Sequence, residues 1–530
     1  MNDMPAPRIG ATDVRREAQL ARVRSEAAWD IVIVGGGATG LGAAVDAASR
    51  GYKTLLLEAE DFAKGASSRS TKLVHGGVRY LAQGNISLVF EALHERGLLQ
   101  QNAPHLCSVL PLVVPAYRWI DQPFYGAGLL LYSVLAGKLG FGFSRLIGRA
   151  EALRLTPTLR AEGLKGGVVY FDGQFDDARM AVALLRTFQD LGGTALNYAK
   201  VAGVLKTGDK VSGVAFVDRE SGDELEARTG GVINATGVFV DAIRQMDEPG
   251  ARMVVAPSQG VHIVLDKSFL PGNHAIMIPK TDDGRVLFAV PWHDRVVVGT
   301  TDTPVPEKSV EPRALEHEVA FLLSHASRYL SRPVRAQDVL SIYAGLRPLI
   351  KAGDGQNTKS LSRDHTVMVS PSGLVTITGG KWTTYRHMGE DVINRVAVVA
   401  GLAPRACQTR TLPLRGATRS DLDDTWRVYG SDAGAVQALC AEREAWRAPM
   451  LRDLPYVLGQ AAWAARFEMA RTVEDVLARR TRALLLNARA SAEAAPAVAR
   501  VLADELGRDD AWVRAQIAQY AELAQGYSLT

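Results

Sequence analysis

Three glycines near the start of the chain have the spacing that binds a nucleotide phosphate. Gly35, Gly37 and Gly40 form a GxGxxG motif directly after the apolar run Asp30–Val34. Such glycines allow a tight turn, a close backbone approach to a pyrophosphate and close packing of helix on strand. Glu58 ends the next apolar run, where a carboxylate can bind ribose hydroxyls and disfavours NADP. The contacts expected from this unit are Gly35, Gly37, Ala38, Thr39, Gly40 and Glu58.

Two further loops carry residues that can contact a long cofactor. The stretch from Ser67 to Gly77 combines hydroxyls, glycines and cations, and Gly379–Arg386 places a glycine pair before a helix some 340 residues after the first loop. One ligand contacted from both ends of an interleaved domain suits FAD better than NAD, and no second complete nucleotide-binding unit is present. The expected cofactor contacts outside the first unit are Ser67, Ser68, Thr71, Lys72, His75, Gly76, Ala235, Thr236, Gly237, Gly380, Lys381 and Thr383.

The elements that must position these loops predict three kinds of domain. Buried strands and an Ala-rich helix surround the first glycines, alternating strands run through 254–299, and helical spacing prevails from 404 onward. We expect an α/β fold with a Rossmann-like FAD-binding domain, an interleaved antiparallel-sheet substrate domain and an all-α C-terminal domain. The expected boundaries are an N-terminal extension at 1–28, the FAD-binding domain at 29–104, 160–245 and 340–402, the substrate-binding domain at 105–159 and 246–339, and the helical domain at 404–530.

Composition narrows the class of protein. The chain has 530 residues, a net charge of +4 and three widely spaced cysteines. This mild basicity does not suggest nucleic acid but is compatible with an anionic substrate or membrane surface. The cysteines suggest neither a disulfide framework nor a metal site, and the N-terminus has no apolar signal segment, so a reducing interior is expected.

One uncharged apolar segment, Gln122–Gly137, is too short and too glycine-rich to be a transmembrane helix. A buried helix is the favoured interpretation. A segment that dips into a membrane interface is the alternative.

Several motifs together resemble FAD-dependent glycerol-3-phosphate dehydrogenase, within the glycine/D-amino-acid oxidase-like flavoprotein superfamily. The most specific are SSRSTKLVHGGVRYL at 67–81 and GGKWTTYR at 379–386. The glycine loop and the GLRPL stretch at 345–349 occur more widely. The matching stretches keep the family order and span most of the chain.

The resemblance implies a chemistry and a set of roles. Oxidation of a secondary alcohol needs a base, for which His262 matches the family position, and histidine suits proton abstraction near neutral pH. A phosphate dianion needs arginine forks and a lysine charge. The implied catalytic residues are His262, Arg347 and Lys381, and the implied substrate contacts are Arg79, Tyr80, Arg347, Arg363, Lys381 and Thr384.

The resemblance also implies a reaction and its partners. The expected reaction converts sn-glycerol 3-phosphate to dihydroxyacetone phosphate, with hydride transfer to FAD and electrons passed to a membrane quinone. The protein would then be cytoplasmic and peripherally bound to the anionic inner face of the cell membrane. The oligomeric state stays open, with a homodimer as one expectation.

Three alternatives remain at this point. An oxidase would use the same substrate but return the electrons to oxygen, and an amino-acid oxidase of the same superfamily would use Arg347 to hold a carboxylate. A flavin-binding module without turnover is the third. The additional cations Arg363 and Lys381 favour a phosphate, and His262 favours turnover.

Overall fold

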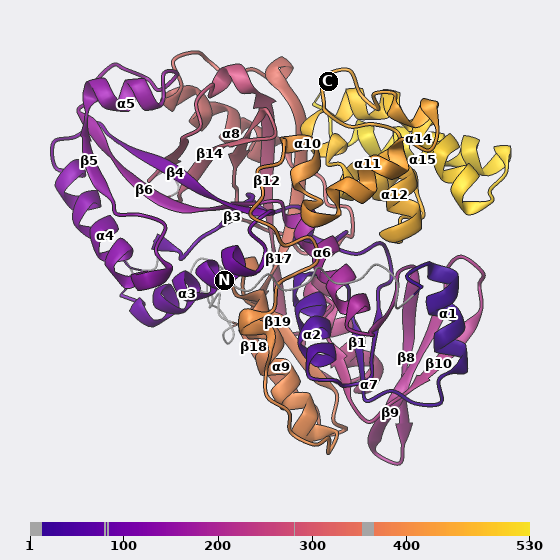
Figure 1. Cartoon of the computed structure of the whole chain (residues 1–530). Coiled ribbons are helices and arrows are strands. Elements are labelled where there is room, and N and C mark those ends of the chain that lie inside the picture. Colours follow the sequence, from indigo (N-terminus) through magenta and orange to yellow (C-terminus); the bar gives the residue numbers. More distant parts are fainter. Residues whose placement is uncertain are drawn as a thin grey trace.

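The structure is a computed structural model that describes residues 13–78, 81, 84–279, 281–282, 284–351 and 365–529. Figure 1 shows three lobes: a nucleotide-binding lobe around β1 and α2, a lobe built on a large sheet that includes β4 and β14, and a helical lobe with α11, α12, α14 and α15. The long strands β12 (Val255–Asp266) and β17 (Val339–Ile350) run between the lobes.

The nucleotide-binding lobe is built on a six-stranded sheet. Its order is β18-β19-β11-β1-β2-β7, and all neighbours are parallel except β18 and β19. Apolar β-branched sequence explains the central strand, since all four residues of β1 are buried, as in a sheet covered on both faces. The elements are β1 (Ile31–Val34), α2 (Ala38–Ser49), β2 (Thr54–Leu57), α6 (Asp177–Asp190), β7 (Thr194–Leu196), β11 (Val232–Asn234), β18 (His365–Val369), β19 (Val375–Gly379) and α9 (Tyr385–Val399).

A small antiparallel sheet extends this lobe. Its three strands pair in the order β10-β9-β8. The N-terminal helix α1 docks here, because the guanidinium of Arg16 is buried against Asp218 at 2.7 Å. The elements are α1 (Arg16–Ser25), β8 (Ala199–Thr207), β9 (Lys210–Asp218), β10 (Glu224–Arg228) and α7 (Val240–Asp247).

The second lobe contains a ten-stranded, mostly antiparallel sheet. Its main path is β16-β12-β15-β14-β13-β4-β6-β3, with β17 paired to β12 and β5 paired to β6. The remaining elements are β3 (Leu73–Val74), α3 (Ile86–Asn102), β4 (Cys107–Ala116), α4 (Asp121–Leu135), β5 (Arg145–Gly148), α5 (Arg149–Leu155), β6 (Gly166–Phe175), β13 (Ala275–Ile278), β14 (Leu287–Trp292), β15 (Arg295–Gly299), β16 (Thr303–Pro304) and α8 (Glu316–Tyr329).

This sheet corrects two expected domain boundaries. Boundaries at 160 and 340 assign β6 and β17 to the FAD-binding domain, but both strands belong to the larger sheet. The register pairs Cys107–Ala116 with Gly166–Phe175 residue by residue, and β17 pairs with β12 along almost its whole length. The physical reason is the long-range ladder of hydrogen bonds, which local sequence pattern does not reveal.

The apolar segment at 122–137 forms α4, and the favoured expectation of a buried helix is wrong. Only Leu129, Tyr132 and Ser133 of α4 are buried. One face packs on the large sheet, and the other carries exposed side chains that include Phe124 and Val134.

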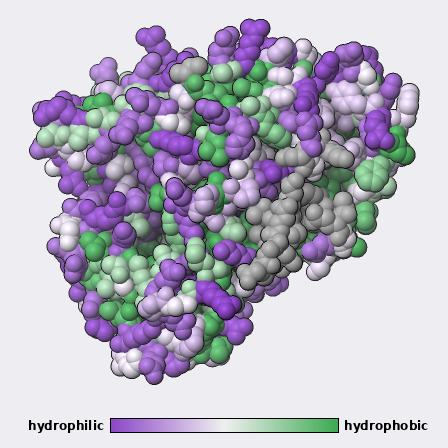
Figure 2. All heavy atoms as spheres, turned by 180° about the vertical axis from the view of Figure 1, so that it is seen from behind, coloured by the Kyte–Doolittle hydropathy of each residue, from purple (hydrophilic) through white to green (hydrophobic). Residues whose placement is uncertain are grey.

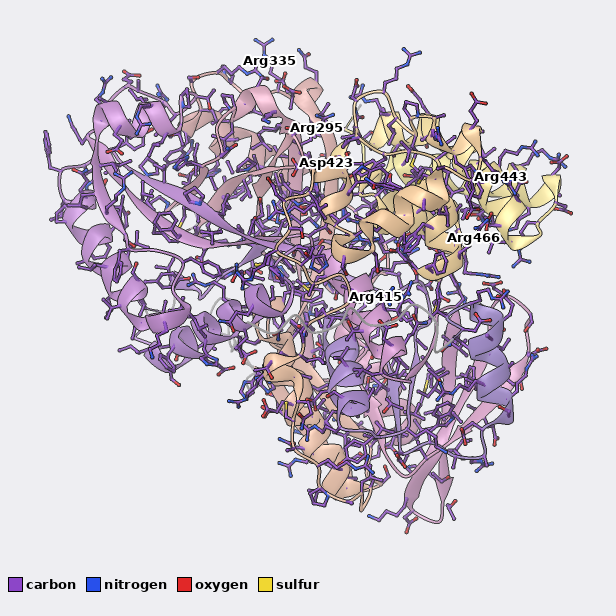
Figure 3. All side chains as sticks on the ribbon, viewed as in Figure 1. Arg295, Arg335, Arg415, Asp423, Arg443 and Arg466 are labelled. Carbon is purple, nitrogen blue, oxygen red and sulfur yellow. The ribbon has the colours of Figure 1, made fainter. Side chains whose placement is uncertain are left out.

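The third lobe is helical, as predicted. Buried ion pairs fasten it to the nucleotide-binding lobe: Arg179 binds Glu468 and Arg480 binds Asp61. Arg415 joins the end of α6 to the helical lobe by binding Asp190 and Asp432. Figure 3 labels Arg415 where these two lobes meet. The helices are α10 (Asp424–Arg427), α11 (Ala433–Cys440), α12 (Gly459–Phe467), a π-helical turn at Asp475–Arg480, α13 (Ala483–Leu486), α14 (Ala488–Leu506) and α15 (Asp510–Gln525).

Candidate active site

A cavity of about 730 Å³ connects the nucleotide-binding lobe to the large sheet. At one end it is lined by the glycine loop with Gly35 and Gly37. At the other end it is lined by His262 and Arg347, which lie on neighbouring strands β12 and β17. The shape therefore suits an elongated ligand that reaches from the phosphate loop to a pocket with a base and a cation.

The phosphate end fits a dinucleotide. A Cβ on Gly35 would lie 2.6 Å from the carbonyl oxygen of Ala235, so only backbone forms this wall. The N-cap residue of α2, Gly37, has no side chain to cover the helix end, and Ala38 and Thr39 of the first turn line the cavity. An uncovered helix N-terminus binds the negative charge of a phosphate.

Glu58 lies at the end of β2, as predicted, and lines the same end of the cavity. Its carboxylate accepts hydrogen bonds from the backbone N–H of Gly36 at 2.5 Å and of Glu60 at 2.9 Å. Burial raises the pKa of this carboxyl above its ordinary value. Glu58 therefore also fixes the conformation of the glycine loop.

The two specific motif loops are hydrogen-bonded to each other beside the cavity. The indole N–H of Trp382 donates to the carbonyl of Ser67 at 2.8 Å. The backbone N–H of His75 donates to the hydroxyl of Thr383 at 3.3 Å. Residues separated by about 300 positions thus form one continuous wall, and each loop stabilises the other.

His262 lies on the cavity face of the large sheet. Side chains alternate along β12, so Gly260 and His262 share one face, and the register places Tyr343 and Gly299 beside His262. The imidazole stacks on the Tyr343 ring with centroids 4.8 Å apart, and its Nε2 lies 2.8 Å from the hydroxyl of Thr71.

Gly299 makes room for the histidine ring. A Cβ at this position would lie 2.7 Å from Cγ of His262, closer than side chains can approach.

Arg347 is held beside His262 by acceptors in the loop between β15 and β16. Its guanidinium donates to Thr300 Oγ1 at 3.0 Å and to Asp302 Oδ1 at 3.3 Å. The side chain crosses Gly260, where a Cβ would lie 2.6 Å from Cζ of Arg347. A guanidinium fixed in this way presents a planar fork to a phosphate or carboxylate.

The electrostatics of the pocket keep His262 neutral. Burial, followed by the positive charges of Arg347 and Lys72, lowers the pKa of this imidazole well below its ordinary value. A neutral imidazole can accept a proton at neutral pH.

The structure brings most of the predicted site residues to the cavity but not all. Ser68, Lys72, Gly76 and Thr384 are buried away from it, and Gly40 packs against Gly35. Arg79, Tyr80 and Arg363 lie outside the described residues. The predicted residues that line the cavity are Gly35, Gly37, Ala38, Thr39, Glu58, Ser67, Thr71, His75, Ala235, Thr236, Gly237, His262, Arg347, Gly380, Lys381 and Thr383.

Sequence reasoning missed the residues that orient the two central side chains. Tyr343 stacks on His262, whereas Thr300 and Asp302 bind Arg347. The signal was present in the period-2 spacing of Tyr343, Gly345 and Arg347, which predicts a shared face once the strand is recognised.

Two further observations concern the described part of the chain. None of its helices is long and apolar enough to cross a membrane. Its His, Cys, Asp and Glu side chains form no group of three or more that could hold a metal ion.

Comparison with known proteins identifies the class first. Residues 30–386 match the family model of FAD-dependent oxidoreductases, and residues 377–513 match the C-terminal domain of alpha-glycerophosphate oxidase. The fold and the cavity are therefore those of an FAD-dependent oxidoreductase, and the glycine-lined phosphate end fits that cofactor.

Individual relatives then identify the family. The mitochondrial glycerol-3-phosphate dehydrogenase of Homo sapiens is 39% identical over 533 residues, covering 93% of this chain and 73% of the relative. That of Schizosaccharomyces pombe is 37% identical and covers 94% and 87%. The crystal structure of the glycerol-3-phosphate dehydrogenase from Bacillus halodurans complexed with FAD has a TM-score of 0.79 and 29% identity, covering 97% of this chain and 98% of that one. The present chain belongs to the family of FAD-dependent glycerol-3-phosphate dehydrogenases.

Proposed function

We propose that this chain oxidises sn-glycerol 3-phosphate to dihydroxyacetone phosphate with FAD and passes the electrons to a membrane quinone. The observation that carries the proposal is the pairing of His262 with Arg347 at one end of a cavity whose other end fits a dinucleotide. Family membership supports the choice of substrate.

His262 is the proposed proton acceptor for the substrate hydroxyl. Oxidation at C2 breaks one O–H bond and one C–H bond, and the proton passes to the neutral imidazole. When bound, FAD supplies the acceptor for the two electrons of the C–H bond. The pKa of His262 rises when a dianion binds in the pocket, because the negative charge of the dianion offsets the positive charge of Arg347.

Arg347 and Lys381 are the proposed phosphate ligands. Both line the cavity, and Arg347 is already oriented by Thr300 and Asp302. A planar fork combined with a lysine charge suits a phosphate dianion better than a single carboxylate. This favours glycerol 3-phosphate over an amino acid.

The proposed base is tested with His262→Gln, which keeps a polar side chain of similar length. We expect the rate of flavin reduction by glycerol 3-phosphate to fall about 10²- to 10⁴-fold, the usual contribution of a positioned base. Bound FAD per protein is the control. A variant that keeps its FAD and reduces it at the normal rate would remove His262 from the mechanism.

The electron acceptor is tested in the same preparation. Reduced enzyme mixed with a soluble quinone should reoxidise faster than with air-saturated buffer, without stoichiometric peroxide. Stoichiometric peroxide and no response to quinone would identify the oxidase alternative.

A membrane quinone requires contact with a bilayer, and we propose that the α4 patch provides it. This patch consists of exposed apolar side chains on and beside α4: Trp119, Ile120, Phe124, Leu131, Val134, Phe143 and Leu146. Trp119 is 75% exposed and Phe143 is 71% exposed, so neither aromatic ring is packed in the core. Hydrophobic side chains gather at the right-hand edge of Figure 2, which corresponds to the α4 side of Figure 1.

The charge around the patch supports an anionic bilayer as its partner. Residues 118–165 contain seven basic residues and three acidic ones. Segments that lie in a membrane interface combine apolar and aromatic anchors with such cations. Each Lys or Arg near an anionic membrane surface contributes about 1 kcal/mol to binding. The basic residues are Arg118, Lys138, Arg145, Arg149, Arg154, Arg160 and Lys165, and the acidic ones are Asp121, Glu151 and Glu162.

The docking proposal is tested by co-sedimentation with phosphatidylglycerol-containing vesicles. Wild-type protein should pellet at low salt and less at high salt, whereas the double variant Trp119→Ser/Phe124→Ser should stay in solution. Val398→Ser is the matched control, because Val398 is 76% exposed on α9, away from the patch. Equal pelleting of the double variant and wild type would contradict this assignment.

A further inference from the structure

His262 has a single polar partner among the described residues. Its Nε2 lies 2.8 Å from the hydroxyl of Thr71, whereas its Nδ1 is buried with no hydrogen-bond partner in the described part of the chain. The ring plane is fixed by stacking on Tyr343, 13° from parallel. Rotation about χ2 would break the Thr71 contact, so this hydroxyl decides which ring nitrogen occupies which position.

Thr71 lies on a loop that Asp177 holds from behind. The carboxylate of Asp177 accepts from the backbone N–H of Ser70 at 3.0 Å and from its hydroxyl at 2.7 Å. It also forms an ion pair at 2.7 Å with the ammonium of Lys72, which in turn donates to the carbonyl of Ser68 at 2.8 Å. Both charged side chains are fully buried. These contacts hold Ser68, Ser70 and Lys72, which lie on both sides of Thr71 in the chain.

The same loop reaches His262 by a second route. The hydroxyl of Tyr343 donates to the carbonyl of Ser70 at 3.0 Å, while its ring stacks on His262. The ammonium of Lys72 lies 5.3 Å from the centre of the Tyr343 ring. The loop therefore fixes both the ring that supports His262 and the hydroxyl that binds it.

We propose that Thr71 is a positioning residue for His262, and that Asp177, Lys72 and Ser70 form a clasp that holds Thr71 in place. This inference rests on the proposed role of His262 as proton acceptor. It assigns Lys72 and Asp177, which belong to motif stretches but lie outside the cavity lining, to the support of the base.

The geometry also assigns the tautomer. A neutral imidazole has one N–H donor and one acceptor nitrogen, and burying a donor without a partner is costly. The hydrogen therefore belongs on Nε2, where the Thr71 oxygen accepts it. The lone pair is then on Nδ1, which has no hydrogen-bond partner among the described residues.

The central test replaces Thr71 by valine, which has nearly the same shape and no hydroxyl. In the FAD-loaded enzyme, Thr71→Val should reduce the flavin about 10- to 100-fold more slowly with glycerol 3-phosphate, the scale of a misplaced catalytic group. Thr71→Ser should recover most of this loss. Thr194→Val is the matched control, because the Thr194 hydroxyl is buried without a partner among the described residues and lies on β7.

A second readout does not depend on turnover. In holoenzyme labelled with ¹⁵N-histidine, His262 should show the Nε2–H tautomer in the wild type and a mixture of tautomers in Thr71→Val. The signal is assigned by its loss in His262→Gln. A wild-type Nδ1–H tautomer, or a normal reduction rate in Thr71→Val, would overturn the proposal.

The clasp is tested by non-additivity. Ser70→Ala removes one contact to Asp177 and should slow flavin reduction alone, but add little in the Thr71→Val background, since both changes act through the same hydroxyl. Fully multiplicative effects would overturn the clasp. If wild-type enzyme is not reduced by glycerol 3-phosphate, the proposed function fails, whereas the tautomer measurement still tests the contact between Thr71 and His262.

Discussion

The crossing of Arg347 over Gly260 allows a perturbation that displaces the cation without mutating it. A Cβ on Gly260 would lie 2.6 Å from Cζ and 2.8 Å from Nη1 of Arg347, with Nη2 closer still. Gly260 lies inside β12 and does not have the left-handed backbone that resists an L side chain. Gly260→Ala should therefore leave the strand intact and push the guanidinium out of its position.

The magnitude follows from the contact that is lost. A hydrogen bond to a charged group contributes about 1.5–3 kcal/mol, which corresponds to roughly 10- to 150-fold in kcat/KM. Replacing a strand glycine by alanine contributes about 0.5–1 kcal/mol to stability, so the Tm should stay level or rise. Loss of activity with retained stability distinguishes a displaced ligand from a damaged fold.

The assay is kcat/KM for glycerol 3-phosphate with an artificial electron acceptor, together with the Tm and FAD content. Gly203→Ala is the matched control, because a Cβ at this strand glycine would meet its nearest atom at 3.9 Å, an ordinary contact. If Gly260→Ala keeps kcat/KM within about twofold of wild type while the control behaves as expected, Arg347 is not the phosphate ligand.

Two further predictions concern stability. Burial, with the charges of Arg179 and Arg427, lowers the pKa of His105 from 6.5 to about 3. Below pH 6.5 the unfolded chain therefore binds a proton that the folded protein does not. The contribution of neutral His105 to the free energy of unfolding is complete above pH 6.5 and is lost as the pH falls toward 3. At pH 5 this loss is about 2 kcal/mol. Between pH 7 and pH 5, the free energy of urea unfolding should therefore fall by about 2 kcal/mol less in His105→Leu than in the wild type. An equal fall in both proteins would contradict this prediction. Asp61→Asn leaves the buried guanidinium groups of Arg479 and Arg480 without their shared carboxylate and should destabilise the protein by about 3–5 kcal/mol in the same assay, and a loss below about 1 kcal/mol would show that the cluster relaxes.

Much of the nucleotide-binding lobe could be predicted from the sequence because its signals are local. The glycine spacing, the apolar run of β1 and the acid at the end of β2 lie within 30 residues of one another, and the structure has them where they were expected. The same holds for the helical C-terminal lobe.

The rest depends on contacts between distant residues. β6 and β17 look like strands of either domain until the hydrogen-bond ladders assign them to the large sheet. Lys72 was expected at the cofactor, but its ammonium is buried against Asp177, more than 100 positions away. The buried helix was favoured at 122–137 because the composition of this segment resembles that of a buried helix, whereas α4 has an exposed face.

The candidate site shows the same division. His262 and Arg347 were found from motifs, because the resemblance names their positions. Their partners Thr71, Tyr343 and Asp302 are neighbours only through the sheet register and the loop packing, which no local pattern encodes.

The central claim is that one cavity joins a bound FAD to a pocket for a phosphorylated alcohol. It is tested most directly by anaerobic titration of the purified FAD-loaded protein with glycerol 3-phosphate, while the visible absorbance of the flavin is followed. The account predicts bleaching by glycerol 3-phosphate at one equivalent of electron pairs per flavin, and no bleaching by glycerol or D-alanine. A flavin that is bound but stays oxidised with glycerol 3-phosphate, or that is bleached equally well by glycerol, would contradict it.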